Sequence, residues 1–74
     1  MTRLKELRKA RGYTQVKMQM LTGIDQSDYS KIENGKRGLS FEQCKSVALA
    51  LETSMDYLAG LTDEVEPYPR RSEK

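Results

Sequence analysis

The stretch from Gly23 to Arg37, GIDQSDYSKIENGKR, carries most of the hydrogen-bonding chemistry that this sequence offers. A glutamine amide donates and accepts together, a serine hydroxyl adapts to either kind of partner, and a lysine donates to a base edge or a phosphate. Catalytic chemistry has few carriers by comparison, because the chain has no histidine and Cys44 is its only cysteine. We therefore expect no catalytic residue, no metal site, no cofactor and no internal disulfide.

Helix geometry decides which of these polar side chains face away from a core. At about 100° per residue, Tyr29 and Ile32 define an inward face, and Glu33 lies close beside them. A polar face on a helix needs no purpose beyond meeting water, so this pattern does not by itself assign a ligand. Ser27 and Lys31 fall nearly opposite this inward face, Asp28 and Ser30 lie on its flanks, and Gln26 lies near the leading tip of the helix. The side chains best placed to meet a ligand are therefore Gln26, Ser27 and Lys31.

Start and stop signals divide residues 2–61 into five short helices, and strand signals are absent from the sequence. Ser, Thr and Asp act as N-caps because their side-chain oxygens accept from the free amides of a first turn. Glycine and asparagine end a helix because they tolerate left-handed backbone. The expected N-caps are Thr2, Thr14, Asp25, Ser40 and Ser54, with a capping box from Ser40 to Gln43. The expected ends are Gly12, Gly23, Asn34-Gly35 and Gly60.

Asp28 has more than one possible role. It stands three residues after Asp25, the reciprocal capping position, and one turn before Lys31, with which it can pair. It could instead accept from a cytosine amino group or repel a nearby phosphate. The sequence leaves the choice between cap and reader open.

An apolar stripe with a helical period supplies one small core. The residues expected on it are Leu4, Leu7, Met18, Leu21, Phe41, Cys44, Val47, Ala48, Leu51, Met55 and Leu58. After Leu61 the sequence TDEVEPYPRRSEK has two prolines, seven charges and one large aliphatic side chain, too little to bury. We therefore predict one domain over residues 1–61 and a mobile charged tail over residues 62–74.

Charge is distributed unevenly along the 74 residues. Residues 1–37 hold nine Lys/Arg and four Asp/Glu, whereas residues 38–74 hold four and seven. A basic half suits a polyanionic partner, although ordinary solvated cations explain the count equally well. The longest apolar run, Val47 to Leu51, is too short for a secretory or membrane segment, so we expect a cytosolic chain with no membrane contact.

An ordered set of motifs extends over residues 3–61. Thr14-Gln15 is followed by Gly23-Ile24, then by YSKIENG over residues 29–35, by Leu49-Ala50-Leu51, and by SMDYLAG over residues 54–60. This set resembles the Cro/phage-repressor (XRE-type) family of helix-turn-helix DNA-binding domains. The resemblance implies an all-α, compact five-helix, lambda-repressor-like fold. In that fold the second and third helices form the helix-turn-helix, and the third lies in the major groove.

The resemblance also implies roles for individual side chains. Gln26, Ser27 and Lys31 match family positions that contact base edges in the major groove. Gln15 matches a residue that binds phosphate and can brace the amide of Gln26. Arg70 and Arg71 could add nonspecific attraction. The expected phosphate contacts are Gln15, Lys17, Asn34, Lys36 and Arg37.

Three further positions bear on structure. Arg8 and Glu33 match a family pair of opposite charges, and we expect them to form a buried ion pair between the first and third helices. Gln19 departs from the small alanine that the family commonly places between the second and third helices. A glutamine there must turn outward if those helices are to approach closely.

The function that this resemblance implies is sequence-specific binding of double-stranded DNA by a phage or mobile-element type of transcriptional repressor or regulator. Such a domain covers one half-site and usually works as a homodimer on a two-fold operator. By family analogy the dimer contact would involve Met55, Tyr57, Leu58 and Leu61. These residues also suit the core, and for Leu58 the core is the safer assignment. The alternative is an antitoxin or adaptor that also holds a protein partner through its acidic half or its tail. An enzyme is not expected.

Overall fold

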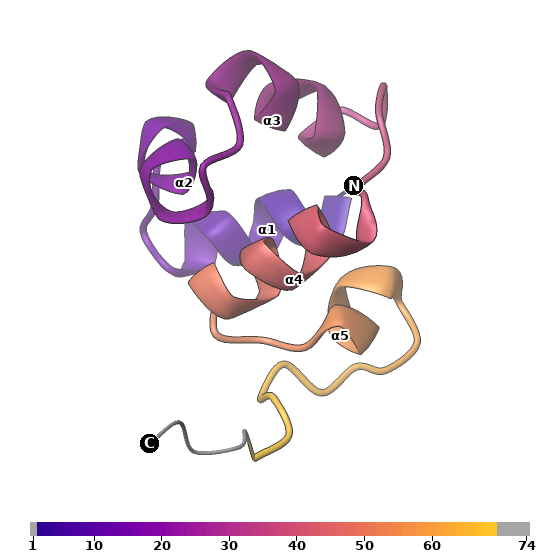
Figure 1. The fold of residues 1–74 in the computed structure, drawn as a ribbon. Coiled ribbons are helices and arrows are strands. Elements are labelled where there is room, and N and C mark those ends of the chain that lie inside the picture. Colours follow the sequence, from indigo (N-terminus) through magenta and orange to yellow (C-terminus); the bar gives the residue numbers. More distant parts are fainter. Residues whose placement is uncertain (1, 70–74) are drawn as a thin grey trace.

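The computed structural model describes residues 2–69, and five short α-helices account for nearly all of its regular structure (Figure 1). None of these described residues forms a strand. The all-α, five-helix prediction is therefore confirmed. The helices are α1 (Thr2–Ala10), α2 (Gln15–Thr22), α3 (Gln26–Glu33), α4 (Phe41–Ala50) and α5 (Met55–Ala59).

Each helix from α2 onward begins at a side-chain cap. The capping box of α4 has both of its bonds: Gln43 N–H donates to Ser40 Oγ at 3.1 Å, and Ser40 N–H donates to Gln43 Oε1 at 3.0 Å. Ser54 accepts from Tyr57 N–H at the start of α5. The helix α1 starts at Thr2 itself, one residue earlier than a cap at Thr2 would allow. Such caps stabilise helices this short because each satisfies an amide that has no partner within the helix.

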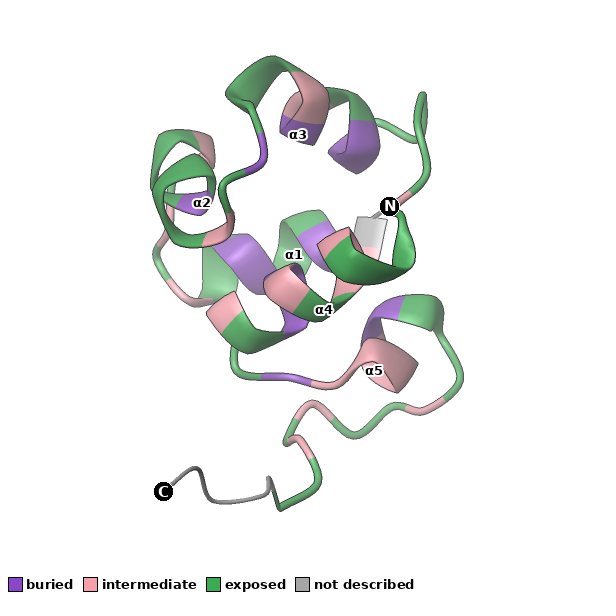
Figure 2. Ribbon diagram, viewed as in Figure 1, coloured by how far each residue is buried: buried purple, intermediate pink, exposed green. Residues whose placement is uncertain are grey.

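The helix α2 packs against both α3 and α4, α1 packs against α3, and α5 packs against α4. Figure 2 shows the buried positions on the inner sides of the helices and the exposed positions on their outer sides. The buried apolar residues are Leu4, Leu7, Met18, Ile24, Tyr29, Ile32, Val47, Ala48, Leu51 and Leu58. This set agrees with most of the predicted stripe.

Two apolar residues predicted to be buried lie near the surface. Phe41 is 68% exposed and Leu21 is 43% exposed. Phe41 is the first residue of α4, and Leu21 belongs to the last turn of α2, so each lies at a helix end beyond the zone where neighbouring helices pack. Helical periodicity gives the direction of a side chain but does not say whether another element covers it.

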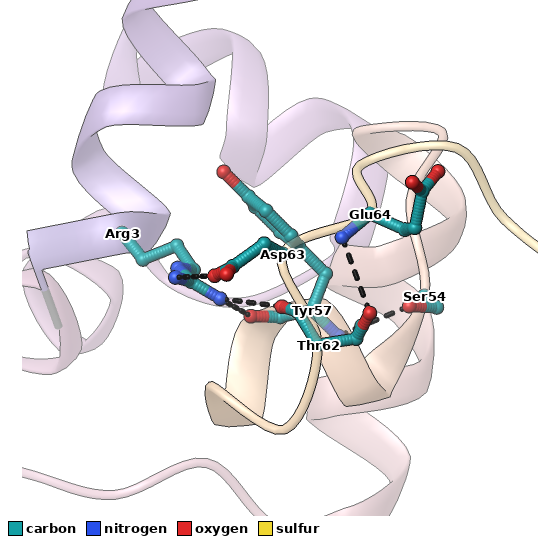
Figure 3. A network of polar contacts seen from close by, with 6 residues as sticks. All are labelled: Arg3, Ser54, Tyr57, Thr62, Asp63 and Glu64. Carbon is teal, nitrogen blue, oxygen red and sulfur yellow. Dashed lines mark hydrogen bonds and ion pairs between the residues drawn. The ribbon is translucent and has the colours of Figure 1, made fainter.

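The segment that follows α5 is attached to α1. The Arg3 guanidinium donates through Nη1 to the carbonyl oxygens of Tyr57 and Thr62, at 3.0 and 2.8 Å (Figure 3). Its Nη2 lies 3.1 Å from Asp63 Oδ1, and its central carbon lies 4.4 Å from the centroid of the Tyr57 ring. Arg3 therefore holds the end of α5 and the residues after it against the first helix.

A second attachment lies at Val65, two residues after Asp63. The hydroxyl of Thr53, a fully buried residue, donates to the Val65 carbonyl at 2.6 Å, and Val65 packs against the core. We refer to residues 62–65 as the strap. These four residues belong to the predicted mobile tail, and they contact the five-helix part of the chain through Arg3 and Thr53, which composition could not reveal. Arg70 and Arg71 lie outside the described residues.

Candidate nucleic-acid interface

The connection between α2 and α3 is short because both of its ends are specified locally. Thr14 Oγ1 accepts from Lys17 N–H at 3.0 Å and so caps α2. Gly23, at φ +77°, ends that helix in the left-handed conformation, which glycine adopts without steric cost. Ile24 is buried, and Asp25 then accepts from Ser27 N–H at 3.0 Å to cap α3. These contacts set α3 across α2 as a helix-turn-helix unit (Figure 1).

Gln19 has a role that sequence reasoning missed. Its Oε1 accepts from the backbone N–H of Gln26 at 2.7 Å, the first amide of α3. The glutamine turns outward, as its size requires, and it links the middle of α2 directly to the start of α3. Two side chains from different places in the sequence, Gln19 and Asp25, thus serve the first amides of the same helix.

The inner and outer faces of α3 are clearly separated. Tyr29 and Ile32 have no exposed surface, and Glu33 is 5% exposed. Ser27 and Lys31, away from this inner face, and Gln26, at the start of the helix, are exposed. Figure 2 shows the outer edge of α3 in the colour of exposed positions. The structure therefore brings these three residues together on one free helix face, and their donors and acceptors are of the kinds that match base edges.

A buried ion pair fastens this helix from behind. Arg8 Nε donates to Glu33 Oε2 at 2.6 Å and Arg8 Nη2 donates to Glu33 Oε1 at 3.1 Å, a two-pronged contact. The two side chains are only 10% and 1% exposed. Arg8 Nη1 also donates to the Tyr13 carbonyl at 2.8 Å. The pair thus joins α1, the α1–α2 connection and α3.

Gln15 takes part in the same network. Its Nε2 donates to Glu33 Oε1 at 3.1 Å, so the first residue of α2 contacts the buried carboxylate and not the amide of Gln26. The predicted brace between Gln15 and Gln26 is replaced by this bond. Gln15 is half-buried, and the second hydrogen of its amide group stays free for another acceptor.

The network changes the ionisation of its members. Burial alone would raise the pKa of Glu33, but the hydrogen bonds from Arg8 and Gln15 hold that pKa below its usual value. Burial raises the pKa of the Tyr29 phenol, and the neighbouring Glu33 carboxylate raises it further. Glu33 is therefore ionised and Tyr29 neutral at neutral pH, and α3 has a charged anchor on its inner side.

The loop after α3 carries the remaining predicted phosphate contacts. Gly35, at φ +76°, turns the chain, and Lys36 N–H donates to the Lys31 carbonyl at 2.8 Å. This bond closes the C-terminal end of α3 and holds the start of the loop against the last turn of the helix. Asn34 and Lys36 are exposed there, and Lys17 is exposed on α2.

Asp28 and Arg37 form an ion pair that the sequence did not predict. Arg37 Nη1 lies 2.8 Å from Asp28 Oδ1. Asp28 does not make the reciprocal cap to Asp25, nor does it pair with Lys31, so both of those expectations are corrected. The guanidinium is held by the loop over the first turn of α3, and its charge attracts the carboxylate more strongly than a neutral backbone amide does.

The positions expected in a dimer contact fall into different environments. Leu58 is 3% exposed and belongs to the core, which was the safer of its two assignments from sequence. Tyr57 is half-buried under the Arg3 guanidinium, and Met55 is half-buried against the core. Leu61 is 78% exposed. Leu61 and the outer part of Met55 are therefore the members of the set that a second molecule could reach.

Comparison with known proteins agrees with this geometry. A family model described as helix-turn-helix matches residues 4–58. The chain belongs to the Cro/C1-type helix-turn-helix family. It is similar to the crystal structure of the restriction-modification controller protein C.AhdI from Aeromonas hydrophila, with 35% identity and a TM-score of 0.74 over 77% of this chain and 86% of that one. No curated protein sequence matches the chain.

Membership of this family settles the class of function. The chain is a sequence-specific DNA-binding transcriptional regulator, and the antitoxin or adaptor alternative is not favoured. The family consists of regulators and is not a class of enzymes. Burial raises the pKa of the Cys44 thiol, which disfavours the nucleophilic thiolate. Among residues 2–69, the helices are all too short or too polar to cross a membrane.

Proposed function

We propose that this regulator reads a two-fold symmetric DNA operator with the outer face of α3. The observation that carries the proposal is the exposure of Gln26, Ser27 and Lys31 on a helix whose inner face is fully buried and anchored through Glu33. A glutamine amide can pair with adenine, and a lysine can donate to guanine. A helix held this firmly presents its side chains in one register, as base readout requires.

Phosphate contacts would set the position of α3 in the groove. Lys17, Asn34 and Lys36 are exposed on the two elements that flank its outer face, and we assign them to the DNA backbone. Gln15 can add one donor without leaving Glu33, since only one of its two amide hydrogens is used there. Arg37 can join them once it leaves Asp28.

A homodimer would give the operator its symmetry. Met55 lines a hollow of about 540 Å³ together with apolar side chains that include Phe41 and Leu49, and Leu61 is exposed after α5. Exposed apolar surface of this kind favours association with a second molecule. Two copies related by a two-fold axis would place their α3 helices on half-sites about 10 base pairs apart.

The genes under control are suggested by the similar protein. C.AhdI is a restriction-modification controller protein, and at 35% identity the likeness supports the same kind of regulation here. We therefore propose that this chain acts in the cytosol on the promoters of restriction-modification genes rather than on phage operators.

Selection of bound sequences from a random duplex pool tests the proposal. At a salt concentration where nonspecific binding is weak, a palindromic motif with half-sites about 10 base pairs apart should be enriched. Recovery of no motif under those conditions would refute the assignment of α3 as a reader. A single half-site without symmetry would refute the homodimer while leaving base readout intact.

Two lysines separate reading from anchoring. Lys31→Ala should change which bases are preferred and lower affinity for the selected site by about 1–3 kcal/mol. Lys36→Ala should weaken binding to all duplexes alike and reduce the salt dependence of binding by about one phosphate contact. Repeating the selection with each variant measures both effects. An unchanged motif for Lys31→Ala would remove that residue from the set of readers.

A further inference from the structure

Asp28 and Arg37 form a contact whose role the reading of DNA does not explain. Asp28 lies in the first turn of α3, directly after Gln26 and Ser27, and Arg37 lies in the loop that returns along the helix. Their side chains are 36% and 47% exposed, and a single contact of 2.8 Å joins them. Both groups can therefore be reached from solvent on the flank of the proposed reading face.

Asp28 is not needed to begin the helix. The amides of Gln26 and Ser27 are already bonded to Gln19 and Asp25. An extra carboxylate beside a DNA-reading face repels phosphate, so a residue with no capping role should be unfavourable there. Its contact with Arg37 is the one polar contact that Asp28 makes within residues 2–69.

Arg37, in contrast to Asp28, carries a charge that attracts phosphate. A guanidinium recognises carboxylate and phosphate with the same planar set of donors. Within residues 2–69 Arg37 makes no polar contact except the one to Asp28, so the rest of its donors face solvent. Half-exposed ion pairs are weak and exchange partners readily. A phosphate that approaches this flank would therefore compete with Asp28 for the same group.

We propose that Asp28 is an intramolecular competitor for Arg37, which holds the guanidinium in the free protein and must be displaced before Arg37 can contact a DNA phosphate. The inference depends on the proposed DNA-reading face. Asp28 then weakens binding to any duplex through Arg37, and it sets how strongly the protein holds nonspecific DNA between operators.

The change of partner by Arg37, from Asp28 to a phosphate, should affect how the dissociation constant for DNA depends on salt concentration. When a lysine or arginine binds a phosphate, a cation condensed on the DNA is released. If Arg37 leaves Asp28 to do so, the freed carboxylate stays beside the DNA and attracts cations to this flank, which offsets part of that release. Removing the carboxylate should expose the full release, so the salt dependence of Asp28→Asn should be steeper by up to about one cation.

A mixed-sequence 20-base-pair duplex labelled with a fluorophore provides the test, with dissociation constants measured by anisotropy across a range of salt concentrations. Asp28→Asn should bind about two- to fivefold more tightly than the wild type at low salt. In an Arg37→Gln background the same substitution should give little or no gain. Glu42→Gln is the matched control, because Glu42 lines the same hollow as Asp28 and forms no ion pair within residues 2–69.

The outcomes separate this inference from the proposed function. A gain that persists in the Arg37→Gln background, or an equal gain for Glu42→Gln, would show that charge alone is responsible and would overturn the inference. Weaker binding by Asp28→Asn would overturn it as well, since Asp28 would then position Arg37. If the wild type shows no binding to the labelled duplex even at low salt, and the selection from a random pool enriches no motif, the proposed function itself fails. Thermal melts of each variant show that it is folded.

Discussion

Arg8 and Arg3 both lie on α1, and their side chains attach this helix to different parts of the molecule in different ways. Arg8 meets a carboxylate inside the protein, with both side chains almost completely removed from water. Arg3 meets Asp63, whose side chain is 98% exposed, and makes its other hydrogen bonds to two backbone carbonyls. The contrast teaches that the acceptor's environment, and not the arginine, decides how much such a contact contributes.

The same contrast changes the meaning of the basic N-terminal half. Arg11, a third arginine near the end of α1, donates to the Leu51 and Glu52 carbonyls at the end of α4. Arg3, Arg8 and Arg11 are therefore used inside the fold, and Arg37 is paired with Asp28. The cations that stay exposed for a polyanion are lysines: Lys5, Lys9, Lys17, Lys31 and Lys36. Net charge overstates the number of cations available to DNA.

The largest effect should come from breaking the buried pair. Arg8→Ala and Glu33→Ala should each cost about 3–5 kcal/mol of unfolding free energy, because each leaves a buried charge without its partner. The double variant should lose much less than the sum of the two. Urea denaturation of the three variants measures this coupling. Additive losses would mean that the pair contributes no more than a surface contact.

An acid titration should show a smaller effect of the same pair. The pKa of Glu33 is held below its ordinary value of 4.5, so its contribution to stability is complete above that value and is lost as the pH falls through the lower, native-state pKa. As the pH is lowered from about 4.5, the urea concentration at the unfolding midpoint should therefore decrease more steeply for the wild type than for Glu33→Gln. Parallel curves for the two proteins would contradict a pKa lowered by Arg8.

The smallest effect should come from the other arginine. Arg3→Ala should cost about 1 kcal/mol, since it removes two partly exposed hydrogen bonds to carbonyls and the stacking on Tyr57. Asp63→Asn is the control and should leave the melting temperature nearly unchanged. Differential scanning calorimetry compares the two. A loss for Asp63→Asn as large as that for Arg3→Ala would make the Arg3 contact an ionic one and remove the contrast with Arg8.

Local features of the fold could be predicted from sequence because short-range chemistry determines them. Thr14, Asp25, Ser40 and Ser54 each accept from an amide two or three residues away, so their roles follow from spacing alone. The contact between Arg8 and Glu33 crosses 25 positions and was predictable only through the family resemblance. The outward face of α3 followed from helix geometry.

The features that escaped prediction depend on how far one side chain reaches across the folded molecule. Gln19 finds an amide seven residues away, and Arg3 finds carbonyls more than fifty residues away. Neither contact leaves a repeat or a spacing in the sequence. The motifs that carry the family resemblance begin at Thr14, and the family model matches residues 4–58, so neither gave a signal for the contacts between Arg3 and the strap. Phe41 shows the converse limit. Its helical spacing from other apolar residues predicted burial, but no element covers its side chain.

The bond from Thr53 to Val65 bears on how this DNA-reading unit can be moved between proteins. A chimera that takes only the five helices would omit the Val65 carbonyl, which the Thr53 hydroxyl uses, and the Thr62 carbonyl, which Arg3 uses. A graft that ends after residue 65 carries both acceptors with it. The transferable module is therefore the helices plus the strap, and recombination between regulators of this kind should succeed more often at a junction beyond the strap than at the end of α5.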